Sequence, residues 1–241
     1  MTEIREFDYF GDGATTPGKE RISWLDRLRM QASIQVRRKI YDWFISQIGD
    51  ISGKSILDHG STPDTLRNDS NCFIRWLLAD GAKVYATSPE DISGLTEVFR
   101  DLQIVPYPPN PELLPPIDYV ISSAVIEHVG SSDRQVKYVE NLLHLARCVL
   151  LTTPNRHHWL DFHTKLPILH WLPRSQHRQI LNALGMKFWA KEENLRLLSQ
   201  SDIAEIFQNV EREHPNGVEV EWYQPKFLGM VSNLVAFIQA K

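Results

Sequence analysis

The sequence predicts an α/β protein built on a doubly wound, mostly parallel β-sheet. Short apolar segments that suit buried strands alternate with longer segments of helical periodicity, as in sheets covered by helices on both faces. The nearly continuous apolar run at 148–153 is typical of a parallel strand that is buried on both sides. Strands expected at 218–222 and 234–238 have no long helix between them, so we expect that pair to be antiparallel.

Local signals place the other elements. Six prolines between 106 and 116 predict a fixed, extended loop, because proline lacks a backbone donor. Asp69 or Ser70 is the expected N-cap of one helix, and Ser132 or Asp133 of another. Proline and acids at 88–91 predict a third helix start. Further strands are expected at 56–57, 84–86 and 118–123, and further helices at 23–48, 179–184 and 201–210.

Composition is that of an ordinary globular protein. The chain has 241 residues, 42% hydrophobic and 23% charged, and its net charge of −4 argues against a nucleic-acid binder. Two distant cysteines form no metal or redox spacing. No signal peptide or transmembrane segment is apparent, so we expect a cytoplasmic protein. The sequence leaves a homo-oligomer open.

The sequence divides into an N-terminal region and a main domain. Residues 1–50 read as a polar arm followed by basic helices that pack on the core, and residues 51–241 as the main domain. The basic region suits either a solvated helix face or a docking surface for an anionic substrate, a phosphate or a membrane headgroup. Its basic residues are Lys19, Arg21, Arg27, Arg29, Arg37, Arg38 and Lys39.

A candidate ligand site follows the first strand. Ile56 and Leu57 lead into Asp58, and Gly60 allows a tight turn. Because open α/β sheets bind ligands at the carboxyl ends of their strands, we expect this turn, with its carboxylate and exposed amides, to form the floor of a cofactor site.

Three blocks in this order resemble class I S-adenosylmethionine-dependent methyltransferases, most closely the type 11/23 group. They are Asp58-His59-Gly60, the segment 121–129 (ISSAVIEHV) and the segment 151–156 (LTTPNR). The resemblance covers roughly residues 50–240 and implies a Rossmann-like methyltransferase sheet of seven strands with the last antiparallel. It also implies S-adenosylmethionine as cofactor, and residues 154–190 as a lid on the acceptor side. The expected cofactor-binding residues are Asp58, His59, Gly60, Ser61, Thr62, Ser88, Glu90, Ser122, Ser123 and Ala124.

The chain departs from this family pattern in two places. Thr62 and Asp64 replace two glycines of the family's turn, and Pro63 removes an amide donor. The second strand ends at Ala86 or Thr87 without the usual acid, and Glu90 is the nearest substitute. These departures leave a second hypothesis open, that of a non-catalytic methyltransferase-like subunit or binding module.

Histidines supply the candidate acid–base groups. Methyl transfer to a hydroxyl is helped by a base of near-neutral pKa, and we expect His128 or His163 in that role. The histidines of segment 157–177 match no metal motif, so no metal is expected. Trp159, Phe162, Trp171 and Trp189 suit either an acceptor pocket or packing within the lid.

The predicted function is methyl transfer, with O-methylation of a small molecule, glycan or lipid-linked intermediate as the expected reaction. A hydrolase is disfavoured because Ser122 and Ser123 lack the Gly-x-Ser-x-Gly setting. A nicotinamide-dependent enzyme is disfavoured because Gly-x-Gly-x-x-Gly is absent after the first strand.

Overall fold

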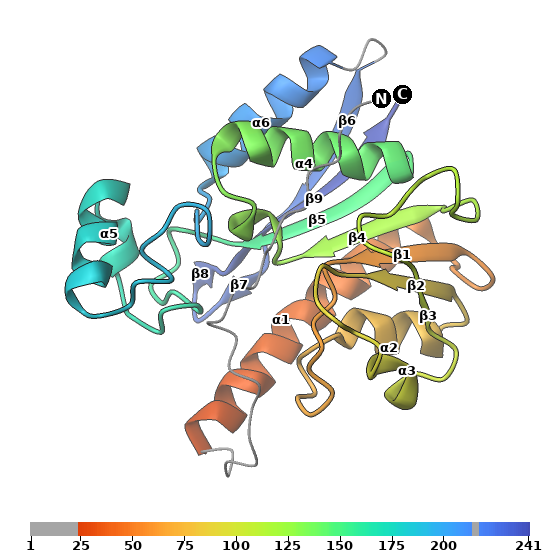
Figure 1. Ribbon diagram of the computed structural model, residues 1–241, viewed down its shortest axis with the longest axis horizontal. Coiled ribbons are helices and arrows are strands. Elements are labelled where there is room, and N and C mark those ends of the chain that lie inside the picture. The colour runs from red at the N-terminus through yellow and green to blue at the C-terminus, as the bar shows by residue number, and fades with distance from the viewer. Residues whose placement is uncertain (1–23, 214–216) are drawn as a thin grey trace.

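A central sheet of seven strands organises the computed structural model, which describes residues 24–213 and 217–241 (Figure 1). The strand order is β3-β2-β1-β4-β5-β9-β6, and β1 to β5 are parallel. β9 runs antiparallel to both of its neighbours, β5 and β6. The predicted mostly parallel sheet with an antiparallel last strand is therefore confirmed. The strands are β1 (Ser55–His59), β2 (Lys83–Thr87), β3 (Gln103–Ile104), β4 (Tyr119–Ser123), β5 (Cys148–Pro154), β6 (Val218–Tyr223) and β9 (Asn233–Ala240).

Helices cover both faces of this sheet (Figure 1). On one face, α4 (Ser132–Leu145) and α6 (Gln200–Glu213) pack through residues such as Leu142 and Ile206. On the other face, α1 (Trp24–Ile48), α2 (Cys72–Ala79) and α3 (Leu95–Val98) bury Phe44, Ile74 and Leu95. Both layers bury apolar surface against the strands, which is the main stabilising contribution in such a fold.

The segment between β5 and α6 lies beyond the carboxyl end of β5. It contains the short turn η2 (Leu169–Trp171) and the helix α5 (Arg174–Ala183), which stands apart from the sheet in Figure 1. A small hairpin of β7 (Lys226–Phe227) and β8 (Met230–Val231) lies between β6 and β9 along the chain. Among the described helices, none has the length and apolar character needed to cross a bilayer.

The expected helix start at 88–91 is wrong. Ser88 Oγ accepts a hydrogen bond from the Glu90 amide at 3.2 Å, and Asp91 Oδ1 accepts one from the Ser93 amide at 3.0 Å. Such local side-chain bonds stabilise turns at the expense of a helix, and α3 begins only at Leu95.

The expected N-caps are also wrong. α2 begins after Asn71, which has the left-handed φ of 51° and makes no side-chain cap bond. Asp69 is instead paired with Arg67, and Ser70 Oγ donates to Asp64 Oδ2 at 2.8 Å. α4 already includes Ser132 and follows Ser131, so its boundary lies one residue earlier than expected.

The basic region forms one continuous helix where it is described. α1 spans 25 residues and buries Val36, Ile40, Tyr41 and Phe44 against the sheet. The expected polar arm, with Lys19 and Arg21, lies outside the described residues.

Candidate functional site

The turn after β1 requires glycine. Gly60 has a φ of +96°, a conformation that residues with a Cβ rarely adopt. A Cβ at this position would also lie 2.5 Å from Cγ2 of Val125, at the end of β4. Gly60 thus allows the β1 and β4 loops to pack directly against each other.

The amides of this turn bond within the protein. Gly60 N and Ser61 N both donate to the carbonyl oxygen of Thr87, at 2.9 and 3.3 Å, and Thr62 N donates to Asn71 Oδ1 at 3.1 Å. The expectation of exposed amides for a ligand is therefore wrong. Thr62 Oγ1, by contrast, is buried and has no hydrogen-bond partner among the described residues.

Asp58 is a buried acid one residue before the end of β1. Ser61 Oγ donates to its Oδ2 at 2.5 Å. Burial raises the pKa of Asp58 to about 6, although the Ser61 hydrogen bond and the charge of Arg37 oppose this rise. A cationic group placed beside Asp58 would offset the cost of burying its charge.

The side chain of His59 points toward the helix layer that contains α4. Its Nδ1 lies 3.1 Å from the hydroxyl of Tyr138 on α4, and its ring packs edge-on against Tyr107. Burial lowers the pKa of His59 to about 4, so the ring is neutral at pH 7. Ser122 lies on the same side, with its Oγ 2.7 Å from the Tyr138 hydroxyl. Both side chains therefore lie in the core between the sheet and α4.

A pocket of about 260 Å³ lies between α1, the carboxyl ends of β4 and β5, and the segment after β5. Ser123, Ala124 and His163, three of the predicted site residues, line it. Ala124 is held at a φ of +58°, an unusual conformation for a residue with a Cβ, and its amide donates to the Thr152 carbonyl. The other predicted residues, at 58–62, 88, 90, 122 and 128, are not among the residues that line this pocket.

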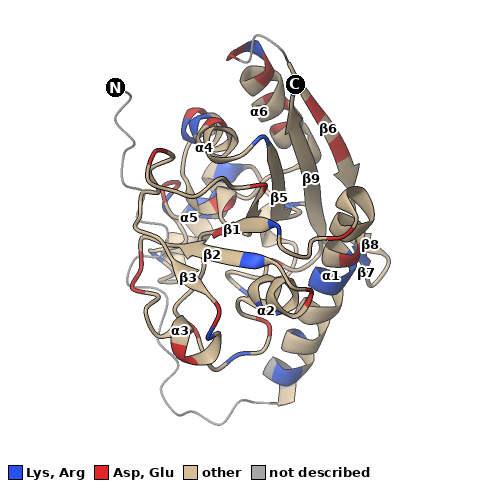
Figure 2. Cartoon of the chain, turned by 90° about the vertical axis from the view of Figure 1, so that its right-hand side faces the viewer, with Lys and Arg blue, Asp and Glu red and all other residues tan. Residues whose placement is uncertain are grey.

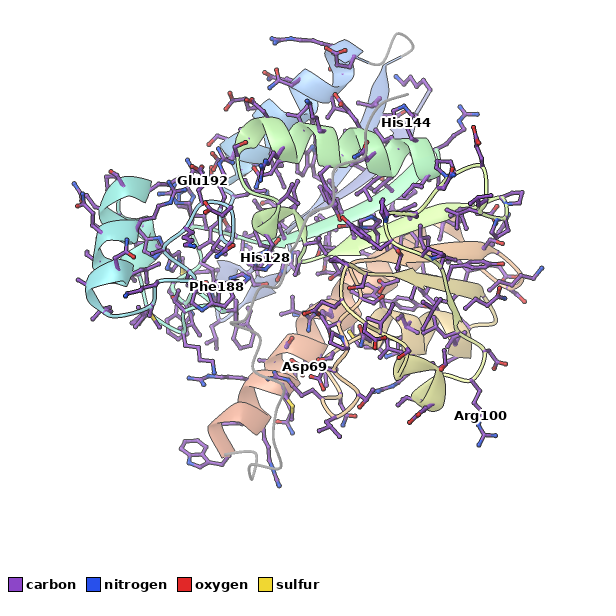
Figure 3. All side chains as sticks on the ribbon, viewed as in Figure 1. Asp69, Arg100, His128, His144, Phe188 and Glu192 are labelled. Carbon is purple, nitrogen blue, oxygen red and sulfur yellow. The ribbon has the colours of Figure 1, made fainter. Side chains whose placement is uncertain are left out.

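One wall of the pocket is basic. Arg29 and Arg37 of α1 line it together with Arg67 and Lys165, against the single carboxylate of Asp69. Arg67 binds Asp69 through two hydrogen bonds of 3.0 Å, and Arg37 donates to the Asp69 carbonyl at 2.8 Å. Figure 2 shows basic residues along α1, and Figure 3 places Asp69 close to that helix. Within the basic region some residues are exposed and others line the pocket, and its role as a docking surface stays a prediction.

The two predicted catalytic histidines lie side by side. His163 Nε2 is 3.2 Å from His128 Nε2 and 3.7 Å from Oε1 of Glu127. Each ring is held through its other nitrogen: His128 Nδ1 lies 2.8 Å from the Asn194 carbonyl, and His163 Nδ1 lies 3.1 Å from Asp161 Oδ1. Figure 3 places His128 near the end of the sheet that faces α5.

The acids around these rings are buried. Glu127 is fully buried; its Oε2 accepts from Thr153 Oγ1 at 2.9 Å, whereas its Oε1 has no hydrogen-bond partner within residues 24–213 and 217–241. Burial raises the pKa of Glu127, and burial together with the charge of His163 lowers the pKa of His128 to about 3. Burial also lowers the pKa of His163, but the hydrogen bond and charge of Asp161 outweigh it and raise that pKa overall.

Sequence reasoning missed the role of Asp161. Its Oδ2 accepts from Thr164 Oγ1 at 2.6 Å while its Oδ1 orients His163. The segment Asp161-x-His163-Thr164 carries this signal, because an acid two residues from a histidine can bond its ring within one turn. Of the four aromatic residues expected in an acceptor pocket or in lid packing, Phe162 lines the 260 Å³ pocket, and Trp189 packs against both His128 and His163.

Comparison with solved structures identifies the same architecture elsewhere. Magnesium protoporphyrin IX methyltransferase from Synechocystis PCC 6803, solved with bound SAH, aligns with a TM-score of 0.55 and 14% identity over 93% of this chain and 90% of that one. The methyltransferase domain of bacterial CtHen1 gives 0.55 and 10% identity over 86% and 99%. A SAM-dependent methyltransferase from Aquifex aeolicus gives 0.52 and 10% over 87% and 98%.

At the level of sequence, no family model and no curated protein matches. These alignments cover most of this chain and most of each solved structure, and at such low identities the likeness concerns the architecture alone. The chain therefore has the fold of the class I S-adenosylmethionine-dependent methyltransferases.

Proposed function

We propose that the protein is an S-adenosylmethionine-dependent methyltransferase that methylates an oxygen atom of a small molecule, glycan or lipid-linked acceptor. The observation that carries this proposal is the pocket bounded by Ser123, Ala124 and His163 at the carboxyl ends of β4 and β5. The chain aligns over 93% of its length with an enzyme solved with bound SAH, at a TM-score of 0.55. In open α/β sheets this edge is where ligands bind.

The residues near the β1 turn suit the polar part of S-adenosylmethionine. Asp58 offers a buried carboxylate to a cationic amino group, and Thr62 Oγ1, which has no hydrogen-bond partner among the residues described, offers a hydroxyl. Glu90, half-buried beyond the end of β2, is the acid nearest in sequence to the position of the missing ribose ligand. When bound, the cofactor supplies an electrophilic methyl group on a sulfonium.

The protein's part in the reaction is alignment and exclusion of water. The segment 154–190 contributes Leu160, Phe162, His163 and Lys165 to the pocket wall, and we propose that it covers the acceptor. The basic wall formed with Arg29 and Arg37 favours an acceptor that carries negative charge near the reacting oxygen. Holding acceptor and methyl donor in line contributes much of the rate enhancement expected for such a transfer.

Binding of S-adenosylhomocysteine, measured by isothermal titration calorimetry, tests the cofactor assignment. We expect one site per chain for the wild type and at least tenfold weaker binding for Asp58→Asn, an order of magnitude that corresponds to about 1.4 kcal/mol. Asp101→Asn, which removes an exposed acid elsewhere, is the matched control and should bind normally. Absence of binding at millimolar S-adenosylhomocysteine would remove the proposal.

A second candidate is a non-catalytic methyltransferase-like module. It is favoured by the turn amides, because Gly60, Ser61 and Thr62 all donate within the protein. Mass spectrometry of candidate acceptors distinguishes the two functions. A mass gain of one methylene that depends on Asp58 supports the enzyme, whereas tight cofactor binding without any methylated product supports the module.

A further inference from the structure

Three ligand-type atoms converge beside the pocket from two separate segments of the chain. Glu127, His128 and His163 each place one ligand atom within 4.8 Å of the other two, and Nε2 of His163 lies 3.2 Å from Nε2 of His128 and 3.7 Å from Oε1 of Glu127. Glu127 and His128 belong to the turn η1 (Ile126–His128) after β4, and His163 belongs to the segment after β5. We propose that these three atoms bind a divalent transition-metal ion, a site that our sequence analysis did not expect.

The hydrogen bonds around the two rings leave their Nε2 atoms as ligands. A carbonyl and a carboxylate can only accept, so Asn194 O and Asp161 Oδ1 require a hydrogen on Nδ1 of His128 and His163. In the neutral rings, both Nε2 atoms then carry lone pairs, and these nitrogens are 3.2 Å apart. Two facing lone pairs repel unless a proton or a metal ion lies between them.

Glu127 favours the metal over a proton. A proton between the rings satisfies the two nitrogens, whereas Oε1 of Glu127, at 3.7 Å from His163 Nε2, is buried with no hydrogen-bond partner in the described part of the chain. A metal ion satisfies all three atoms, and its charge offsets the cost of burying this carboxylate. Zinc at about 2.0–2.1 Å from two imidazole nitrogens holds them roughly 3.3 Å apart at the tetrahedral angle, close to the observed separation.

The surrounding contacts resemble those that orient metal ligands in proteins. Asp161 holds His163 as a carboxylate–histidine pair and is itself bound by Thr164. Thr153 fixes the other oxygen of Glu127, and Asn194 fixes His128. Two imidazoles and one carboxylate are a ligand set used by zinc and by non-haem iron, with coordination positions left open.

The site borders the pocket through His163. An ion there can bind an acceptor hydroxyl and lower its pKa, which serves the same purpose as a general base. This consequence rests on the proposed function, and it restricts the acceptor to molecules with an oxygen ligand at the reacting position. Metal binding itself does not depend on the cofactor or the acceptor.

The full chain is first freed of any polyhistidine tag and dialysed against a chelator to remove metals. Calorimetric titration with Zn²⁺ and visible spectroscopy with Co²⁺ then test the site. We expect one ion per wild-type chain and a ligand-field spectrum for Co²⁺. Glu127→Gln and His163→Ala should both lose binding and spectrum. Asp161→Asn, which removes only the orienting carboxylate, should bind about 10- to 100-fold more weakly.

His157→Ala is the matched control, because it removes an exposed histidine from the same segment. Circular dichroism checks that each variant is folded, and Glu127→Gln keeps the size of the buried side chain. The proposal is overturned if the wild type binds no ion, as expected for a proton shared between the rings. It is equally overturned if His157→Ala reduces binding as much as His163→Ala does.

Methyl transfer by the chelated and the reloaded protein is a separate readout. Metal binding without methyl transfer under either condition removes the proposed function and leaves the metal site standing. Methyl transfer by a protein that binds no metal supports the proposed function and removes the metal site.

Discussion

Asp58 and His59 are adjacent buried residues whose ionisation affects stability in opposite directions. Burial raises the pKa of Asp58 to about 6, so the folded state binds a proton more readily than the unfolded chain, and stability falls as the pH rises through this range. Burial lowers the pKa of His59 to about 4, so the unfolded chain binds a proton first, and stability falls as the pH decreases from about 6.5 to 4. The two contributions therefore largely cancel between pH 7 and pH 5.

Single substitutions should separate these two effects. We compare the change in the free energy of unfolding when the pH is lowered from 7 to 5. Relative to the wild type, this change should be about 2 kcal/mol more favourable for His59→Gln and about 1 kcal/mol less favourable for Asp58→Asn. Urea unfolding at both pH values measures each difference, with the exposed His157→Gln as the control. The explanation fails if both variants change the pH dependence of stability in the same direction.

At the scale of elements, one arginine connects α1 to the loop before α2. Arg37 donates to the carbonyl of Asp69 at 2.8 Å and to Ser33 Oγ at 2.7 Å. Arg37→Leu leaves that carbonyl without this donor, and we expect it to lower the free energy of unfolding by about 1–3 kcal/mol. It should also speed proteolysis of the loop at 61–71. Arg27→Leu, on an exposed part of the same helix, should change neither quantity.

Some of these elements could be predicted from the sequence, and others could not. Strands and long helices were predictable because apolar periodicity reflects burial in a layered sheet, as for β5 and α6. The starts of α2 after Asn71 and of α3 at Leu95 were missed, because Asp69 and Asp91 bond to residues only two positions away and so stabilise turns instead of helix starts. His128 and His163 were identified singly, but their contact joins positions 35 residues apart, and no local pattern specifies it.

At the scale of the whole molecule, the sheet has two edges of different kinds. β3 is only two residues long, whereas the other edge strand, β6, has six. The exposed Glu219 and Glu221 alternate along β6, and Figure 2 shows them as an acidic stripe. Charged side chains on an edge strand oppose pairing with a second sheet, so we interpret this stripe as protection against edge-to-edge association.

Replacing both acids by valine should therefore cause association. We expect Glu219→Val combined with Glu221→Val to form dimers or larger species in light scattering at concentrations where the wild type does not change size. Glu205→Val combined with Glu211→Val, on the exposed face of α6, makes the same change in charge and hydrophobicity. Equal association of the two double variants would show that the edge is not responsible.

The position of β9 has a consequence for biosynthesis. This strand lies between β5 and β6 in the sheet, yet it follows both along the chain. A ribosome therefore delivers every other strand of the sheet first, and the nascent chain must wait with a gap where β9 belongs. Until that gap is filled, unpaired backbone on β5 and β6 is open to other polypeptides, so chaperone binding during synthesis should concentrate on this half of the protein.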